Sequence, residues 1–125
     1  LKKLQAKIDA GADYIVTQMF FDNQKYFDFV EKVRAAGIDA PIIPGLKPIT
    51  TLSQIVNLPK TFFLDLPDDL LTALEKCKSN ADVKAVGIEW AIQQSKELIK
   101  YGVPTLHYYT MSKADTTYKV AKEVF

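Results

Sequence analysis

The stretch Ile38-Asp39-Ala40-Pro41-Ile42-Ile43-Pro44-Gly45 decides the fold class. Its apolar run is short and lacks the alternation of a half-exposed strand, which favours a strand covered on both faces, as in parallel sheets. Its two prolines must then lie at the strand ends, where no ladder N–H is needed. Two further strands are predicted, over Tyr14–Met19 and Thr105–Tyr109, because these runs are rich in β-branched and aromatic residues.

Segments with helical spacing separate these strands, and residues typical of helix ends bound them. The first predicted helix opens the chain, with Leu1, Leu4 and Ile8 on its apolar face and a stop at Gly11. The second spans Gln24–Ala36, with Asp22-Asn23 as its N-cap and a stop at Gly37. A short third helix runs from Thr50 or Thr51 to about Asn57. Three later helices are predicted. One starts near Pro67, and a long one runs from about Asp82 to Tyr101 with a stop at Gly102. The last follows Ser112 as its N-cap, with Asp115 three residues further on. For the long helix the expected apolar stripe is Ala85, Ile88, Ala91, Ile92, Leu98 and Ile99.

Strands that alternate with helices predict right-handed βαβ units and a parallel sheet, and therefore an α/β fold. A parallel sheet with only three strands is a poor independent unit, because its outer strands have nothing to pair with. The chain also opens directly in a helix, without an initiator Met or a signal peptide. We therefore expect either self-association through the sheet edges or a piece of a longer polypeptide.

Composition excludes several classes of function. The 125 residues have the size of one domain, with 48% hydrophobic and 25% charged residues. A formal charge of +1 removes the electrostatic case for a nucleic-acid or anionic-membrane partner. No apolar run approaches the ~20 residues that cross a bilayer. Cys77 is the only cysteine, which excludes a disulfide scaffold, and no ligand spacing predicts a metal site.

The residues with chemical potential follow the predicted strands, at the edge where parallel strands meet ligands. They form three clusters, Thr17–Asp22, Pro44–Pro48 and His107–Met111. The Gln18 carboxamide can pair with the edge of a heterocycle, although on the residues alone a bond to neighbouring backbone is the commoner role. For His107 a packed core imidazole is favoured, and Cys77 is predicted to be a buried small hydrophobe.

The order and spacing of several short motifs resemble the C-terminal part of the catalytic barrel of the methylenetetrahydrofolate reductase family, of the bacterial type. These motifs are Asp9-Ala10-Gly11-Ala12, Thr17–Asp22, Ala36-Gly37-Ile38, Ile42-Ile43-Pro44-Gly45 with Pro48 beyond, Gly102-Val103, and His107-Tyr108-Tyr109-Thr110. The resemblance runs through the whole chain. It implies that residues 1–125 are the C-terminal three-strand segment of a (β/α)8 TIM barrel, whose N-terminal half is absent from this chain.

The resemblance further implies a cytoplasmic, homo-oligomeric FAD flavoenzyme of one-carbon metabolism and methionine biosynthesis. Such an enzyme reduces 5,10-methylenetetrahydrofolate to 5-methyltetrahydrofolate with NAD(P)H. Its catalytic carboxylates belong to the N-terminal half, so no catalytic residue is expected here and the isolated segment should be inactive. Nothing in this segment reads the ribose 2′ position that separates NADH from NADPH.

Four residues of this chain match binding residues of that family. Gln18 and Gln54 match glutamines that contact the folate, and Lys7 matches a basic residue that contacts FAD. Lys113 stands where the family commonly has an arginine that meets the substrate's glutamate tail, so the charge is kept without the bidentate fork. Leu58 replaces a phenylalanine that stacks on ligand in some members.

Two other hypotheses remain open from the residues. The chain could be a self-standing α/β binding or interaction module that oligomerises through its sheet edges. It could also belong to another flavin-dependent barrel, which would share the architecture without reducing folate.

Overall fold

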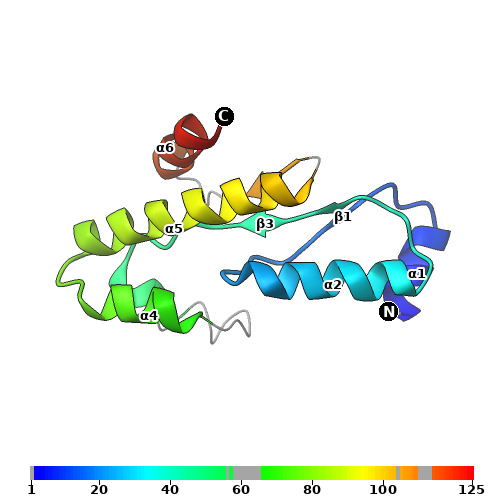
Figure 1. The fold of residues 1–125 in the computed structure, drawn as a ribbon, viewed down its shortest axis with the longest axis horizontal. Coiled ribbons are helices and arrows are strands. Elements are labelled where there is room, and N and C mark those ends of the chain that lie inside the picture. Colours follow the sequence, from blue (N-terminus) through cyan, green and yellow to red (C-terminus); the bar gives the residue numbers. More distant parts are fainter. Residues whose placement is uncertain (1, 56, 58–65, 104, 110–113) are drawn as a thin grey trace.

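The computed structural model describes residues 2–55, 57, 66–103, 105–109 and 114–125. The elements are α1 (Lys2–Asp9), β1 (Ile15–Val16), α2 (Asn23–Ala35), β2 (Ile42–Ile43), β3 (Gly45–Leu46), α4 (Asp68–Glu75), α5 (Asn80–Tyr101), β4 (His107–Tyr108) and α6 (Ala114–Val124). Residues 52–55 and 57 are also helical. The structure confirms the mixed α/β fold with parallel strands and helices, in the predicted order (Figure 1).

The strands pair in parallel, but the central one is divided. β1 pairs with β2, and β3 pairs with β4. The two prolines lie at the ends of the central strand as predicted, since β2 spans Ile42–Ile43 between Pro41 and Pro44. The second short strand beyond Pro44, β3, was not predicted. The carbonyl of Pro44 still accepts from His107 N at 3.0 Å, and that of Ile43 accepts from Thr17 N at 3.0 Å. The middle segment therefore pairs first with β1, through Ile42 and Ile43, and then with β4, through Gly45 and Leu46.

Local signals place most helix ends. The glycines predicted to stop α1, α2 and α5 all have positive φ, between +84° and +110°. Asp22 caps α2, since its carboxylate accepts from Gln24 N at 3.0 Å. The long helix α5 begins at Asn80, two residues earlier than predicted, because Ser79 Oγ accepts from Asp82 N at 3.3 Å. The predicted Ser112 cap lies outside the described residues, and Asp115 instead pairs with Lys84 at 2.9 Å.

Helix α5 is the centre of the helical layer and contacts α2, α4 and α6. Its predicted apolar stripe is partly wrong, because Ala85 and Ile99 are exposed. The buried face is formed by Val83, Gly87, Ala91, Ile92, Gln94, Ser95 and Leu98. A hydrophobic pattern misses this face because one glycine and two polar side chains belong to it.

The main cores lie between the strands and helices α2, α4 and α5. One cluster joins Tyr26 and Val33 of α2, Ile42 and Leu46 of the strands, and Leu98 of α5. Another is centred on Met19, Phe21, Ile49, Leu70, Leu74 and Val83. None of the helices in the described ranges is both long and apolar enough to cross a membrane.

Candidate functional site

The three predicted clusters meet at the carboxyl ends of the strands, and Thr17 joins them. Its hydroxyl oxygen accepts a hydrogen bond from Gly45 N at 2.9 Å. Its carbonyl oxygen accepts from the Tyr109 hydroxyl at 2.8 Å. The residues just beyond the carboxyl ends of β1, β2 and β4 are therefore tied together at one edge, as expected for parallel strands.

Gly45 permits this junction because the Tyr109 ring passes directly over it. A Cβ built at Gly45 would lie 2.6 Å from the Thr17 carbonyl oxygen and 2.6 Å from Tyr109 Cε2. Real Cβ atoms do not come so close to other atoms. Besides the turn that a Pro-Gly pair favours, Gly45 thus allows the Tyr109 side chain and the Thr17 backbone to come close to the strand.

Replacing Gly45 with alanine should lower the free energy of unfolding by about 2 kcal/mol, since Tyr109 must leave Thr17 to make room. Urea unfolding of the purified protein measures this. Tyr109→Phe is the control, because it loses the hydroxyl bond but keeps the ring, and it should cost only about 1 kcal/mol. Equal stability of Gly45→Ala and the wild type would contradict the close approach.

Gln18 lies at this edge with its side chain exposed, between half-buried Thr17 and buried Met19. Among the described residues its amide makes no hydrogen bond, in contrast to the backbone-bonded role that the residues alone favoured. Both its donor and acceptor atoms are available to a ligand. Gln18 is therefore placed as a binding residue would be.

Gln54, the second predicted folate contact, holds the turn that follows β3. Its Oε1 accepts from Thr50 N at 2.7 Å and lies 3.4 Å from the Thr50 hydroxyl. Its Nε2 has no bond within the described part of the chain. The described contacts do not join Gln54 to Gln18, and both Lys113 and Leu58 lie outside the described residues.

Lys7 is separated from the strand-end cluster. It is exposed in the last turn of α1, which leads into the amino end of β1. Figure 1 shows α1 beside the carboxyl end of α2, whereas the amino end of α2 follows the Gln18 segment. The structure therefore does not bring Lys7 and Gln18 together.

His107 and Cys77 differ from their expected environments. The core position predicted for His107 is wrong, because its side chain is exposed and meets the Tyr109 ring edge-on at a centroid distance of 4.6 Å. β4 turns the neighbouring Tyr108 inward instead, where its hydroxyl lies 2.7 Å from Ser95 Oγ and burial raises the pKa of the phenol. Cys77 is half-buried against the core, with Sγ 3.6 Å from the Ala73 carbonyl.

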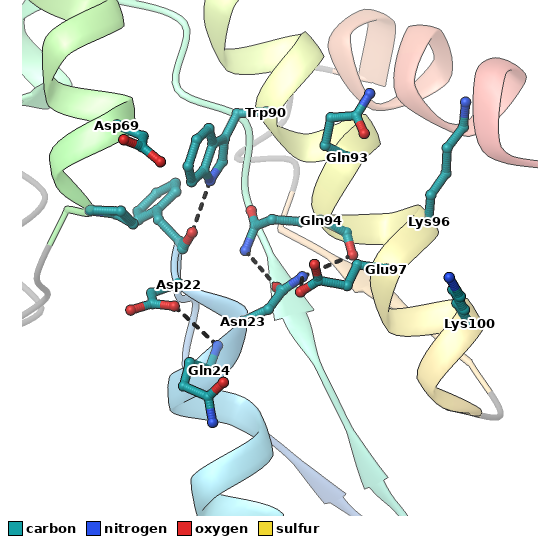
Figure 2. A pocket seen from close by; sticks show the side chains of 12 residues that line it. Asp22, Asn23, Gln24, Asp69, Trp90, Gln93, Gln94, Lys96, Glu97 and Lys100 are labelled. Atoms are coloured by element: carbon teal, nitrogen blue, oxygen red, sulfur yellow. Dashed lines mark hydrogen bonds between the residues drawn. The ribbon is translucent and has the colours of Figure 1, made fainter.

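Sequence reasoning missed a polar group on α5 that contacts the segment after β1. Figure 2 shows Trp90 and Gln94 directed toward the backbone that precedes α2, with Asn23 beside Gln94. They line an open cavity of about 760 Å³ between α2, α4 and α5. The available signal was the polar Gln94 on a face where the helical period expects an apolar residue. No group of three metal-ligating side chains occurs in the described ranges.

Comparison with known proteins decides the family. The model of the methylenetetrahydrofolate reductase family matches residues 1–124. This chain belongs to the methylenetetrahydrofolate reductase family. The resemblance inferred from the motifs is thereby confirmed.

Relatives in this family come from plants, fungi, animals and bacteria. Methylenetetrahydrofolate reductase (NADH) 1 of Arabidopsis thaliana is 39% identical over 113 residues, which cover 90% of this chain and 19% of that protein. The 5,10-methylenetetrahydrofolate reductase of Salmonella typhimurium is 33% identical over 121 residues, which cover 96% of this chain and 41% of that protein. The chain thus spans about a fifth to two fifths of the length of these relatives.

A solved structure from Clostridium thermocellum shares the fold. That protein is described as binding two copies of 5-methyl-5,6,7,8-tetrahydrofolic acid. The TM-score is 0.57 at 17% sequence identity, over 97% of this chain and 45% of the other. At that identity the likeness is one of fold.

Proposed function

We propose that this chain is the C-terminal three-strand segment of a methylenetetrahydrofolate reductase, and that it supplies part of the folate site. The whole enzyme reduces 5,10-methylenetetrahydrofolate to 5-methyltetrahydrofolate with NAD(P)H and FAD, in cytoplasmic one-carbon metabolism and methionine biosynthesis. The observation that carries the proposal is the exposed Gln18 amide, unpaired among the described residues, at the edge where three strand ends meet.

The strand pairing supports a (β/α)8 barrel for the whole protein. Ile42–Ile43 pair with β1, whereas β4 pairs further along, with Gly45–Leu46. Such a stagger between neighbouring strands accompanies the tilt of strands in a barrel. A barrel of this type needs ~250 residues, which is about twice the length of this chain and agrees with the greater length of the relatives.

The proposed role of Gln18 follows from its chemistry. A carboxamide presents a donor and an acceptor side by side and so matches the edge of a pterin. Because Thr17 and Met19 are fixed by hydrogen bonds and burial, the backbone that bears the amide is already ordered before the substrate binds. Gln54 would add its free Nε2 donors, and Lys113 would attract the substrate's glutamate tail as a point charge.

The described residues do not by themselves fit a flavin site. Lys7 is the one residue here that the family resemblance assigns to FAD, and it lies at the opposite end of β1 from Gln18. The described part of the chain also has no buried polar side-chain atom left without a partner. We therefore assign the remaining FAD contacts to the other βα units of the proposed barrel.

The isolated chain should bind no FAD and should not oxidise NADH. A flavin titration and an NADH oxidation assay of residues 1–125 test this expectation. Stoichiometric FAD with turnover would contradict the assignment of the catalytic residues to another part of the enzyme. The longer protein should instead reduce methylenetetrahydrofolate. Reduction of menadione without reduction of the folate would favour another flavin-dependent barrel.

A self-standing module that oligomerises through its sheet edges is the second candidate. In the described ranges the outer edges of β1 and β4 have no partner strand. Tyr14, just before β1, and Val16, within it, are 59% and 38% exposed. Such an edge favours association with a further strand. A mass measurement in solution separates the candidates, because a module oligomerises as it stands, whereas a barrel segment needs the preceding βα units.

A further inference from the structure

The segment that carries Gln18 is held from α5 by two hydrogen bonds to its backbone. The indole Nε1 of Trp90 donates to the Phe21 carbonyl at 2.8 Å. The Nε2 of Gln94 donates to the Phe20 carbonyl at 3.2 Å. Trp90 and Gln94 are four residues apart and so lie on one face of α5 (Figure 2). Two successive carbonyls of the segment thus receive donors from a single rigid helix.

A buried pair of amides locks this arrangement. Gln94 Nε2 also donates to Asn23 Oδ1 at 3.1 Å, and Asn23 Nδ2 donates to the main-chain carbonyl oxygen of Gln94 at 3.2 Å. The same Asn23 nitrogen lies 3.0 Å from Glu97 Oε1. Asn23 and Gln94 are only 8% and 5% exposed. Buried amides are costly unless they are bonded, so the satisfied pair admits one geometry and excludes shifted ones.

The opposite side of Gln18 is anchored as well. Thr17 is bonded to Gly45 and Tyr109, and Met19 is fully packed in the core. Gln18 therefore lies between two fixed points, the strand junction at Thr17 and the helix bonds at Phe20 and Phe21. Its backbone has little freedom to shift, while its side chain remains exposed.

We propose that Asn23, Trp90 and Gln94, here named the α5 clamp, are positioning residues that hold Gln18 for the folate substrate. This inference rests on the proposed function. None of the three needs to touch the substrate, because each acts through the backbone that bears Gln18. Asn23 and Gln94 are 71 residues apart in the chain, so α5 fixes the backbone that bears a binding residue just after β1.

Kinetics of the longer protein test the α5 clamp. Gln94→Leu and Trp90→Phe remove the donors but keep much of the side-chain volume. Each should raise the KM for methylenetetrahydrofolate about tenfold, because a small displacement of a positioning group weakens binding, and should leave kcat for NADH–menadione turnover unchanged. Gln93→Leu is the matched control, since Gln93 lines the same cavity but, among the described residues, its side chain bonds Glu89 one turn earlier on α5. It should change neither value. An unchanged KM in both clamp variants would overturn the proposal.

Hydrogen exchange separates failure of the α5 clamp from failure of the proposed function. In Gln94→Leu the amides of residues 18–22 should exchange at least about tenfold faster, while those of α4 and α6 stay as in the wild type. Unchanged exchange at 18–22 overturns the clamp even if the wild type reduces folate. A wild type that shows no folate reduction, but whose segment loosens in the variant, refutes the proposed function and leaves the clamp's hold on the Gln18 segment supported.

Discussion

Replacing Gly87 with alanine is expected to lower the free energy of unfolding by about 3 kcal/mol or more, or to prevent folding. A Cβ at Gly87 would overlap the carbonyl oxygen of Ile49 and would lie 2.8 Å and 2.9 Å from its carbonyl carbon and nitrogen. These are backbone atoms, which cannot turn aside as the end of a side chain can. Ile49 is itself buried in the cluster with Leu70 and Val83, so the loop after β3 has no room to move away from α5.

Urea unfolding followed by circular dichroism measures this loss. Gly102→Ala is the matched control, because Gly102 has nothing within 4 Å and suffers only from its positive φ of +110°. Strain of that kind costs about 1–2 kcal/mol. If Gly87→Ala loses no more stability than Gly102→Ala, the contact between α5 and the Ile49 backbone is not as close as described.

Local chemistry made the element order and most helix ends predictable. Asp22 caps α2 and Gly37 follows it because both depend on only a few neighbouring residues. The same holds for the parallel strands, which the apolar run around Ile42 and Ile43 indicates. The family was also readable, because its motifs follow one another in order along the chain.

Features that depend on tertiary contacts were not predictable from the pattern. The further strand β3 beyond Pro44 depends on pairing with β4, about 60 residues later in the chain. The exposure of the His107 side chain was not predictable, since a two-residue strand does not reveal which of its faces is covered. The buried face of α5 includes Gln94 because Asn23, 71 residues away in the chain, satisfies its amide. No residue near Gln94 in the sequence indicates that Asn23 is its partner.

The site was predictable to a similar, limited extent. The strand-end position of Gln18 follows from the α/β pattern, but its role in folate binding came from the family resemblance. Its lack of a hydrogen bond within the described residues required the structure. For Gln54 the structure shows instead that the side-chain oxygen already accepts a hydrogen bond from Thr50 N.

Gln18→Ala in the longer protein is expected to slow folate reduction by about 10- to 100-fold, because hydrogen bonds worth about 1–3 kcal/mol to the bound substrate are lost. Oxidation of NADH should be largely unaffected, since the contact proposed for the amide is with the folate. Gln24→Ala is the control, because the Gln24 side chain is also exposed but bonds Asp28, one turn further along α2. It should leave both reactions unchanged.

The two half-reactions of Gln18→Ala, measured separately by stopped flow, test the central claim that this segment supplies part of the folate site. The account predicts a slow reaction with methylenetetrahydrofolate and a normal reaction with NADH. A folate half-reaction as fast as that of the wild type would contradict it.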